Sequence, residues 1–286
     1  MLRLLLFLAL GSASIQAQVK APDADLRSRF KLDPHYQKCL VVESFPIVAS
    51  DKVPDEALEE AAHTIRHMLD GRADILRALG DNRIRFGIMA VTERTCDLPE
   101  HSDLTPPAYW NVRARGLGAT RERPCVSCGA ENILHNPGDP YSTESILVHE
   151  FAHAIHLIGL ASVDPDFDAR LAKTYQAALA KGLWKGTYAS ENKEEYWAEA
   201  VQSWFDTNRE NDAIHNHVNT RKELKAYDPG LAALCKEVFG KNSWRYVRAD
   251  HPSRRDEPHL KKLDRSQLPT FAWTPAELEA YEKVEE

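Results

Sequence analysis

An H-E-x-x-H pattern constrains this chain more than any other feature of its sequence. It comprises His149, Glu150 and His153 and lies inside a largely apolar stretch, residues 142–160. On an α-helix, positions i and i+4 share a face, so the two imidazoles can bind one metal ion. Glu150 is then placed to take a proton from the metal-bound water. The pattern fixes only three letters, so an ordinary helix with two hydrogen-bonded histidines is the alternative.

The residues around this pattern predict a buried helix over 142–160. Ser142 or Thr143 is expected to cap its N-terminus, Glu144 to lie in its first turn and Gly159 to fall near its end. Its apolar side chains predict burial and are Ile146, Leu147, Phe151, Ile155 and Ile158.

The composition is that of a globular protein. The chain has 286 residues, of which 43% are hydrophobic and 28% charged, so it can bury a sizeable core. Its net charge of -7 is modest, and the charges are mixed in sign along the chain. We therefore expect a single soluble domain over residues 18–286, with a charged tail from Asp250 and no nucleic-acid partner.

The first 17 residues have the composition of a signal peptide. Arg3 supplies the positive charge, residues 4–10 a short apolar run, and residues 11–17 the small side chains before cleavage after Ala17. The apolar run is too short to span a bilayer, and no second run of spanning length follows it. The mature chain is expected to be secreted or periplasmic, with no membrane span after signal removal.

Export makes disulfides possible, and the chain has five cysteines. An odd number leaves at least one thiol free or paired between chains. Cys125 and Cys128 form a C-x-x-C pair without a second such pair, which disfavours a zinc knuckle. A disulfide from Cys125 or Cys128 to Cys96 is the favoured expectation, although the sequence does not fix the connectivity.

The N-terminal third predicts a small sheet backed by helix. Residues 39–49 and 83–92 alternate and are rich in β-branched or apolar side chains, which predicts two strands. Between them, residues 54–69 have helical spacing with Asp51 as a cap, and a shorter helix is expected over 73–79.

The middle of the chain, residues 93–140, has little periodicity and many turn formers. Within it, residues 109–120 predict a Gly-bearing edge strand before residues 131–134, where an extended peptide could pair by strand addition. A surface loop is the alternative. Beyond the apolar stretch, helices are expected over residues 164–181, 192–207 and 228–239.

A catalytic zinc usually takes three protein ligands and leaves a fourth position for water. The metzincin spacing fails because this chain has His156 and Gly159 where that pattern needs Gly and His. The thermolysin-like spacing fails because no glutamate lies between Glu150 and Glu191. Asp164, Asp166 and Asp168 remain alternatives in a helix-opening turn. For His156, a hydrogen-bonded structural role is favoured over that of a fourth ligand.

The next available carboxylates lie on the predicted helix over residues 192–207. Glu195 and Glu199 are four residues apart and share a face, and Glu194 is adjacent. Solvent-exposed surface charges are the alternative interpretation. Beside aromatic residues such as Trp197, however, carboxylates are costly to bury unless they are paired or bound to metal.

The segment Tyr188-x-x-x-Asn192-x-x-Glu195-Tyr196-Trp197-Ala198-Glu199-Ala200 resembles that of the anthrax lethal factor-like metallopeptidases, a group that includes the Pro-Pro endopeptidases. The sequence His149-Glu150-Phe151-Ala152-His153 is similar to that group's H-E-(F/W)-G-H, with Ala152 in place of glycine. The resemblance covers roughly residues 105–207 and is specific in the two helices and Tyr188.

This resemblance implies an α+β zincin-like fold, with a small mixed sheet, a metal helix and a helical lower lobe. It implies one catalytic Zn²⁺ with His149, His153 and Glu195 as ligands, and with Glu199 behind them to orient a ligand histidine. Glu150 would act as general base and Tyr188 as stabiliser of the oxyanion. The expected function is that of a secreted zinc endopeptidase that binds peptide or protein substrate as an extended strand. The alternatives are an inactive zinc-containing binding protein and a metal hydrolase acting on non-peptide substrates.

Overall fold

The structure is a computed structural model that describes residues 18–285. Its sheet has five strands in the order β1-β2-β3-β5-β4. β1 and β2 pair antiparallel, β2, β3 and β5 run parallel, and β4 pairs antiparallel with β5 at the edge. The fold is therefore α+β with a small mixed sheet, as predicted. The strands are β1 (Lys38–Val42), β2 (Phe45–Ala49), β3 (Arg85–Met89), β4 (Gly116–Leu117) and β5 (Cys125–Gly129).

The predicted strand over residues 39–49 is wrong in one respect, because it is a hairpin. Val42 pairs with Phe45, which leaves a turn of two residues, Glu43 and Ser44. Glu43 adopts a left-handed conformation with φ 56°, as hairpin turns of two residues require. Glu43 and Ser44 are two adjacent polar residues between Val42 and Phe45, and this break in the alternation marks the turn that a single strand over 39–49 overlooked.

Strand β5 was not predicted. All five of its residues are buried, because it lies inside the sheet between β3 and β4. A strand buried on both faces has no polar alternation to signal it.

The predicted disulfide to Cys96 is wrong, since all five cysteines are free. Cys125 and Cys128 are three positions apart on β5, so their side chains point to opposite faces of the sheet. Burial raises the pKa of both of these thiols, and raises that of Cys39 to about 12. These cysteines are core residues of the sheet.

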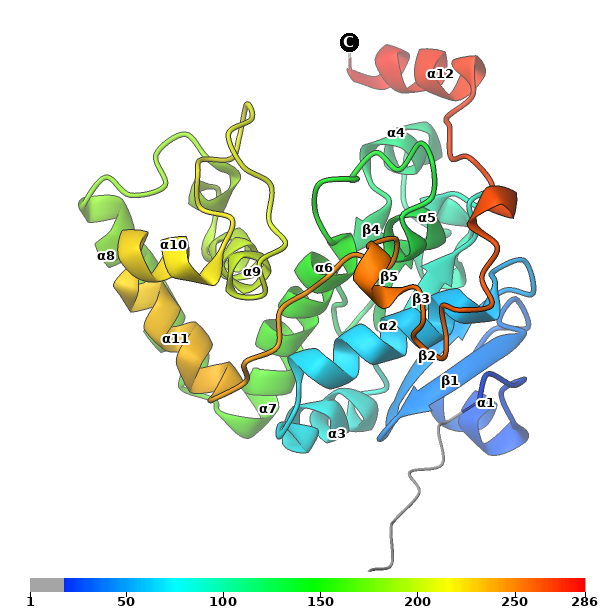
Figure 1. Cartoon of the computed structure of the whole chain (residues 1–286), viewed down its shortest axis with the longest axis horizontal. Coiled ribbons are helices and arrows are strands. Elements are labelled where there is room, and N and C mark those ends of the chain that lie inside the picture. Colours follow the sequence, from blue (N-terminus) through cyan, green and yellow to red (C-terminus); the bar gives the residue numbers. More distant parts are fainter. Residues whose placement is uncertain (1–17, 286) are drawn as a thin grey trace, which may run out of the picture.

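Helices cover the sheet unequally (Figure 1). The main hydrophobic core joins the sheet to α2 and α3 and to the buried helix α6. A smaller core on the other face contains Phe30 of α1, Tyr36 and Leu98. The helices of this part are α1 (Ala24–Phe30), α2 (Asp55–Met68), α3 (Ala73–Asp81), α4 (Pro107–Arg113), α5 (Ala130–Leu134) and α6 (Ile146–Ala154).

A helical part follows α6 and lies beside it (Figure 1). Its helices are α7 (Ala161–Val163), α8 (Phe167–Ala180), α9 (Lys193–Trp204), α10 (Arg221–Tyr227) and α11 (Pro229–Phe239). The three helices predicted after residue 160 are thus confirmed as α8, α9 and α11. α10 was not predicted.

Three expectations about helix ends and the middle segment are corrected. Pro54, not Asp51, is the N-cap residue of α2 and makes no side-chain cap. Ser145, rather than Ser142 or Thr143, caps α6, so Glu144 precedes that helix. The predicted edge strand over residues 109–120 begins as the end of helix α4, and only β4 pairs at the sheet edge.

Within residues 18–285, one helical stretch, Ile146–Val163, is long and apolar enough to cross a membrane. However, 78% of it is buried inside the protein, which is the behaviour of a core helix. The predicted signal peptide lies outside the described residues.

The charged C-terminal tail is ordered and returns across the sheet-bearing part (Figure 1). Arg254 donates two hydrogen bonds to Glu60 of α2, at 2.7 and 2.8 Å. Farther along, α12 (Pro275–Glu285) lies against α4, where the rings of Tyr109 and Tyr281 stack at 5.6 Å. The tail therefore joins α2 to α4.

Candidate metal centre

Helix α6 presents the two histidines of the H-E-x-x-H pattern on one face. The Ser145 side chain accepts a hydrogen bond from the Val148 amide (3.4 Å) and so begins the helix. His149 and His153 are buried, with relative exposures of 6% and 8%. Buried imidazoles need partners, which come from α9.

Helix α9 brings Glu195 to these histidines. Its N-cap residue Asn192 accepts a hydrogen bond from the Glu195 amide (2.8 Å), which fixes Glu195 in the first turn. The Trp197 indole donates to the carbonyl of Ala152 on α6 (3.0 Å). This contact locks the two helices together beside the carboxylate.

Three ligand atoms converge at one point. His149 Nε2 lies 3.0 Å from Glu195 Oε2 and 3.3 Å from His153 Nε2, and His153 Nε2 lies 3.5 Å from Glu195 Oε2. Ligands about 2.1 Å from a tetrahedral zinc are about 3.4 Å apart. The triangle formed by His149, His153 and Glu195 therefore has the size of one face of such a site.

Gln202 sets the tautomer of His149. Its amide nitrogen donates to the buried carboxylate of Glu144 (2.9 Å), which Arg209 also contacts, so its oxygen must face the imidazole. That oxygen lies 2.8 Å from His149 Nδ1, which therefore carries the proton. With Nδ1 engaged by Gln202, Nε2 is the nitrogen of His149 that faces Glu195, where a proton or a metal ion between them would satisfy both groups.

The charges around the triangle also favour a positive charge among these three side chains. Burial by itself lowers the pKa of His149, but the hydrogen bond with Glu195 and the charges of Glu150 and Glu195 raise it to about 10. Burial opposes ionisation of Glu195, yet hydrogen bonds from both histidines hold its pKa well below the usual value. The centre therefore stabilises positive charge.

Glu150 and Tyr188 line the cleft that opens onto this triangle. The cleft has a volume of about 510 Å³. Burial raises the pKa of Glu150, while the nearby histidines lower it. Tyr188 opens the short helix η4 (Tyr188–Ser190), and its ring stacks near that of His149, with centroids 6.2 Å apart. The structure thus brings together all five residues to which catalytic or ligand roles were assigned.

Glu199 and Glu194 lie farther from the centre than Glu195. The carboxylate of Glu199 accepts from Asn208 (2.8 Å) and is 3.7 Å from His149 Nδ1, on the side of the ring away from the triangle. The nearer partner of that nitrogen is Gln202, which the sequence did not single out. Glu194 lines the cleft and lies 3.8 Å from Lys193.

Two of the three alternative aspartate ligands pair with other side chains, and the third, Asp166, is the N-cap residue of α8 and makes no side-chain cap. Asp164 pairs with Arg170 (2.6 Å), while Asp168 contacts both Lys193 (2.6 Å) and His156 (2.9 Å). His156 is therefore a hydrogen-bonded structural histidine, as expected. It lies in a π-helical turn, η3 (Ile155–Leu160), that directly continues α6.

No protein-family model matches this chain, and no curated protein matches it.

Strand β4 forms a wall of the cleft. A Cβ at Gly116 would lie 2.4 Å from Ile146 Cγ2, and one at Gly118 would lie 2.8 Å from His153 Cβ. Only glycine allows the edge strand to approach α6 this closely. Leu117 pairs with Ser127 of β5, and the Arg115 carbonyl accepts from the Gly129 amide (2.9 Å). Hydrogen-bonded and non-hydrogen-bonded residue pairs alternate along an antiparallel ladder. The N–H and C=O groups of Gly116 therefore point away from β5, toward the cleft.

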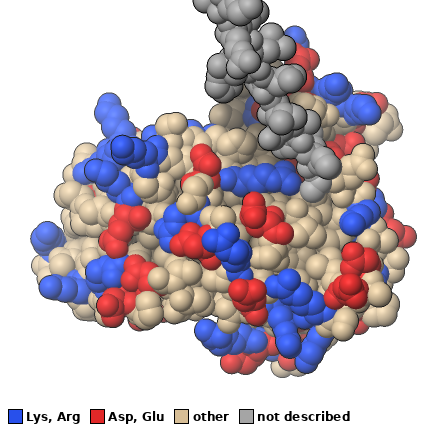
Figure 2. Space-filling view, turned by 90° about the horizontal axis from the view of Figure 1, so that it is seen from below, with Lys and Arg blue, Asp and Glu red and all other residues tan. Residues whose placement is uncertain are grey.

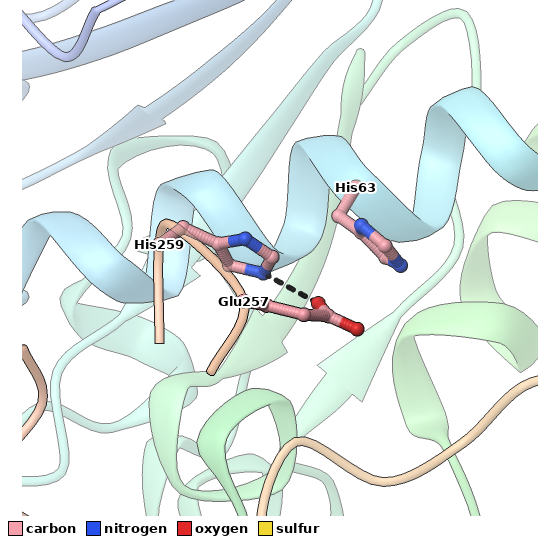
Figure 3. A group of neighbouring side chains, drawn as sticks. All are labelled: His63, Glu257 and His259. Atoms are coloured by element: carbon pink, nitrogen blue, oxygen red, sulfur yellow. Dashed lines mark ion pairs between the residues drawn. The ribbon is translucent and has the colours of Figure 1, made fainter. Parts of the chain in front are cut away.

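A second group of metal-ligand side chains, His63, Glu257 and His259, lies between α2 and the tail (Figure 3). Both carboxylate oxygens of Glu257 accept from Arg254, at 2.8 and 2.9 Å. His259 Nε2 lies 2.7 Å from Glu60, whose oxygens also accept from Arg254. The guanidinium already supplies the positive charge here, so we assign this group to tail attachment.

Figure 2 shows one outer face of the molecule, on which basic and acidic side chains are interspersed. This distribution agrees with the mixed charge along the sequence.

Proposed function

We propose that this protein is a secreted zinc-dependent endopeptidase with a zincin-like fold. The observation that supports this most strongly is the convergence of His149, His153 and Glu195 beside Glu150, in a cleft walled by an edge strand. Two imidazole nitrogens and one carboxylate oxygen are a ligand set typical of catalytic zinc, with a fourth position left for water.

When bound, Zn²⁺ would act as a Lewis acid and lower the pKa of its water to about 7. Glu150 takes the proton of the attacking water and passes it to the leaving amine. Burial raises the pKa of this carboxylate and so makes it a stronger base for that proton. Tyr188 donates its phenol proton as a hydrogen bond to the developing oxyanion.

The substrate is a peptide in extended conformation. The backbone groups of Gly116 on β4 face the cleft and offer one donor and one acceptor for strand addition. An extended polypeptide has the same regular spacing of N–H donors and C=O acceptors as an edge strand. This match favours a peptidase over a hydrolase of other substrates.

The test compares the wild type with Glu150→Gln and Glu195→Ala on a diverse peptide library read by mass spectrometry, together with metal analysis. We expect one zinc per wild-type and Glu150→Gln chain, and a loss of cleavage of at least about 10²-fold in Glu150→Gln. Glu195→Ala is expected to lose zinc.

Cleavage by Glu150→Gln at the wild-type rate would show that the mechanism is wrong. Full zinc content in Glu195→Ala would remove Glu195 from the ligand set. A wild type that holds zinc and cleaves no peptide would favour the inactive binding protein instead.

A further inference from the structure

Arg113 is the last residue of α4 and lines the cleft three residues before Gly116. It shares this cleft with Tyr188 and with Glu195 of the triangle. Burial lowers the pKa of the Arg113 guanidinium, but the nearby Tyr188, Tyr141 and Tyr109 raise it. Arg113 therefore lies near the group assigned to the oxyanion.

The other arginines near this wall are neutralised by acids of the protein. Arg115 is fully buried and donates two hydrogen bonds to Glu131, at 2.6 and 3.0 Å. Arg209 contacts Glu144 and lies 3.8 Å from Asp212. Within residues 18–285, by contrast, Arg113 has no carboxylate within 4.0 Å, and it is exposed.

The surroundings of Arg113 suit a planar anion. Tyr109, Trp110 and Tyr141 line the same cleft. The Tyr141 hydroxyl donates to the Arg113 carbonyl (3.5 Å), which holds the end of α4 in place. A guanidinium without an acidic partner of its own can bind a carboxylate through two parallel hydrogen bonds.

We propose that Arg113 recognises a carboxylate of the substrate within about three residues of the scissile bond. The carboxylate is either an Asp or Glu side chain or the α-carboxylate of the substrate's C-terminus. This specificity rests on the peptidase function proposed above, and it names a substrate class: peptides with a negative charge close to the cleavage site.

The first arm of the test measures cleavage. Peptides with Glu at each position flanking the cleavage site are compared with their Gln counterparts, and free C-termini with amidated ones. For wild type we expect kcat/KM to be roughly 10- to 100-fold higher for the peptide that carries the recognised carboxylate. Arg113→Gln should abolish that preference, whereas Arg255→Gln, on the exposed tail, should keep it.

The second arm measures binding without turnover. In the zinc-loaded Glu150→Gln background, the dissociation constants of the same peptides are compared with and without Arg113→Gln. We expect the Glu150→Gln protein to bind the carboxylate peptide roughly 10- to 100-fold more tightly than its neutral counterpart, and the added Arg113→Gln to remove the difference. Tighter binding that depends on Glu at one position identifies a side-chain carboxylate. Tighter binding that depends on a free C-terminus identifies the α-carboxylate.

Equal binding of charged and neutral peptides by the Glu150→Gln protein would overturn the specificity, whatever the activity of the wild type. An equal loss of kcat on all peptides in Arg113→Gln would also overturn it, because Arg113 would then only position Tyr188. Absence of cleavage with retained carboxylate-dependent binding would contradict the proposed peptidase but support the role of Arg113.

Discussion

Gln202 is the residue that most changes the description of the metal centre. The resemblance assigned the orientation of a ligand histidine to Glu199, yet Gln202 Oε1 is 2.8 Å from His149 Nδ1, and the nearer Glu199 oxygen is 3.7 Å away. In sequence, Gln202 is a single amide within an apolar helix segment, and its exposure is 0%. A buried side-chain amide needs several hydrogen-bond partners, and this need was the signal by which Gln202 could have been found.

Replacing Gln202 with Leu should weaken zinc binding. The variant leaves the His149 Nδ1 proton without its acceptor, so the imidazole is free to change tautomer and tilt. Loss of such a partner typically costs about 10- to 100-fold in metal affinity. Competition with a chelator measures the effect, and Gln176→Leu on the exposed face of α8 is the control. Equal affinities of the two variants would contradict this role.

Two of the three candidate ligands were predictable, because helical spacing fixes their relative positions. His149 and His153 share a face in any helix, and Asn192 begins the predicted helix, where the structure has it as the N-cap of α9. The choice of Glu195 over Glu194 or Glu199 was not derivable in this way, because it depends on the crossing of α6 and α9. That crossing is fixed by tertiary contacts such as the hydrogen bond from Trp197 to Ala152.

At the scale of elements, strands were predicted less well than helices. β5 has no alternation because both of its faces are buried, and residues 107–113 form α4 although they precede an edge strand. β4 has only two residues, a length at which no periodicity exists. Its position follows instead from Arg115, whose buried pair with Glu131 anchors the start of the strand.

The glycine at 116 determines how close β4 lies to α6. In Gly116→Ala the new methyl group would lie 2.4 Å from Ile146 Cγ2 and 3.0 Å from the Ser127 carbonyl oxygen, so the strand must shift. We expect a loss of about 1–3 kcal/mol in the free energy of unfolding. We also expect a marked loss of kcat/KM with zinc content unchanged.

Urea unfolding and peptide cleavage test this prediction together. Gly230→Ala is the matched control, because there the nearest atom is 3.3 Å away on the flexible Thr174 side chain. Wild-type activity in Gly116→Ala would show that the spacing between β4 and α6 is not critical.

At the scale of the whole molecule, one buried ion-pair network holds the tail to α2. The Glu60 and Arg254 side chains are only 2% and 6% exposed. The sequence of this tail is charged and interrupted by prolines, and it predicted no element there. Its order arises from contacts with α2, nearly 200 residues earlier in the chain, which no local pattern encodes.

Arg254→Met should destabilise the fold by about 3–5 kcal/mol, because it leaves the buried Glu60 carboxylate without its cation. The double variant Glu60→Leu/Arg254→Met should recover part of this loss. Urea unfolding measures both, with Arg255→Met as the exposed control at the next position. A loss in the double variant equal to the sum of the two single losses would contradict the pairing.

The same network predicts a pH dependence. Burial raises the pKa of Glu60, but hydrogen bonds from His259 and Arg254 outweigh it, so the folded-state pKa lies below the usual value of 4.5. The unfolded chain therefore takes up this proton first, and the stabilisation present above pH 4.5 is lost as the pH falls through the lowered value. Arg254→Met should move acid unfolding to higher pH, measured by circular dichroism.

The contact between α12 and α4 makes one wall of the cleft depend on a segment far along the chain. Trp273 donates to the Asn111 carbonyl (2.9 Å) and Tyr281 stacks on Tyr109, so the helix that leads into this wall is braced by residues more than 160 positions later. The triangle of His149, His153 and Glu195 is held by α6 and α9 and does not touch this brace. Removal of α12 would therefore loosen the cleft wall and leave the triangle in place.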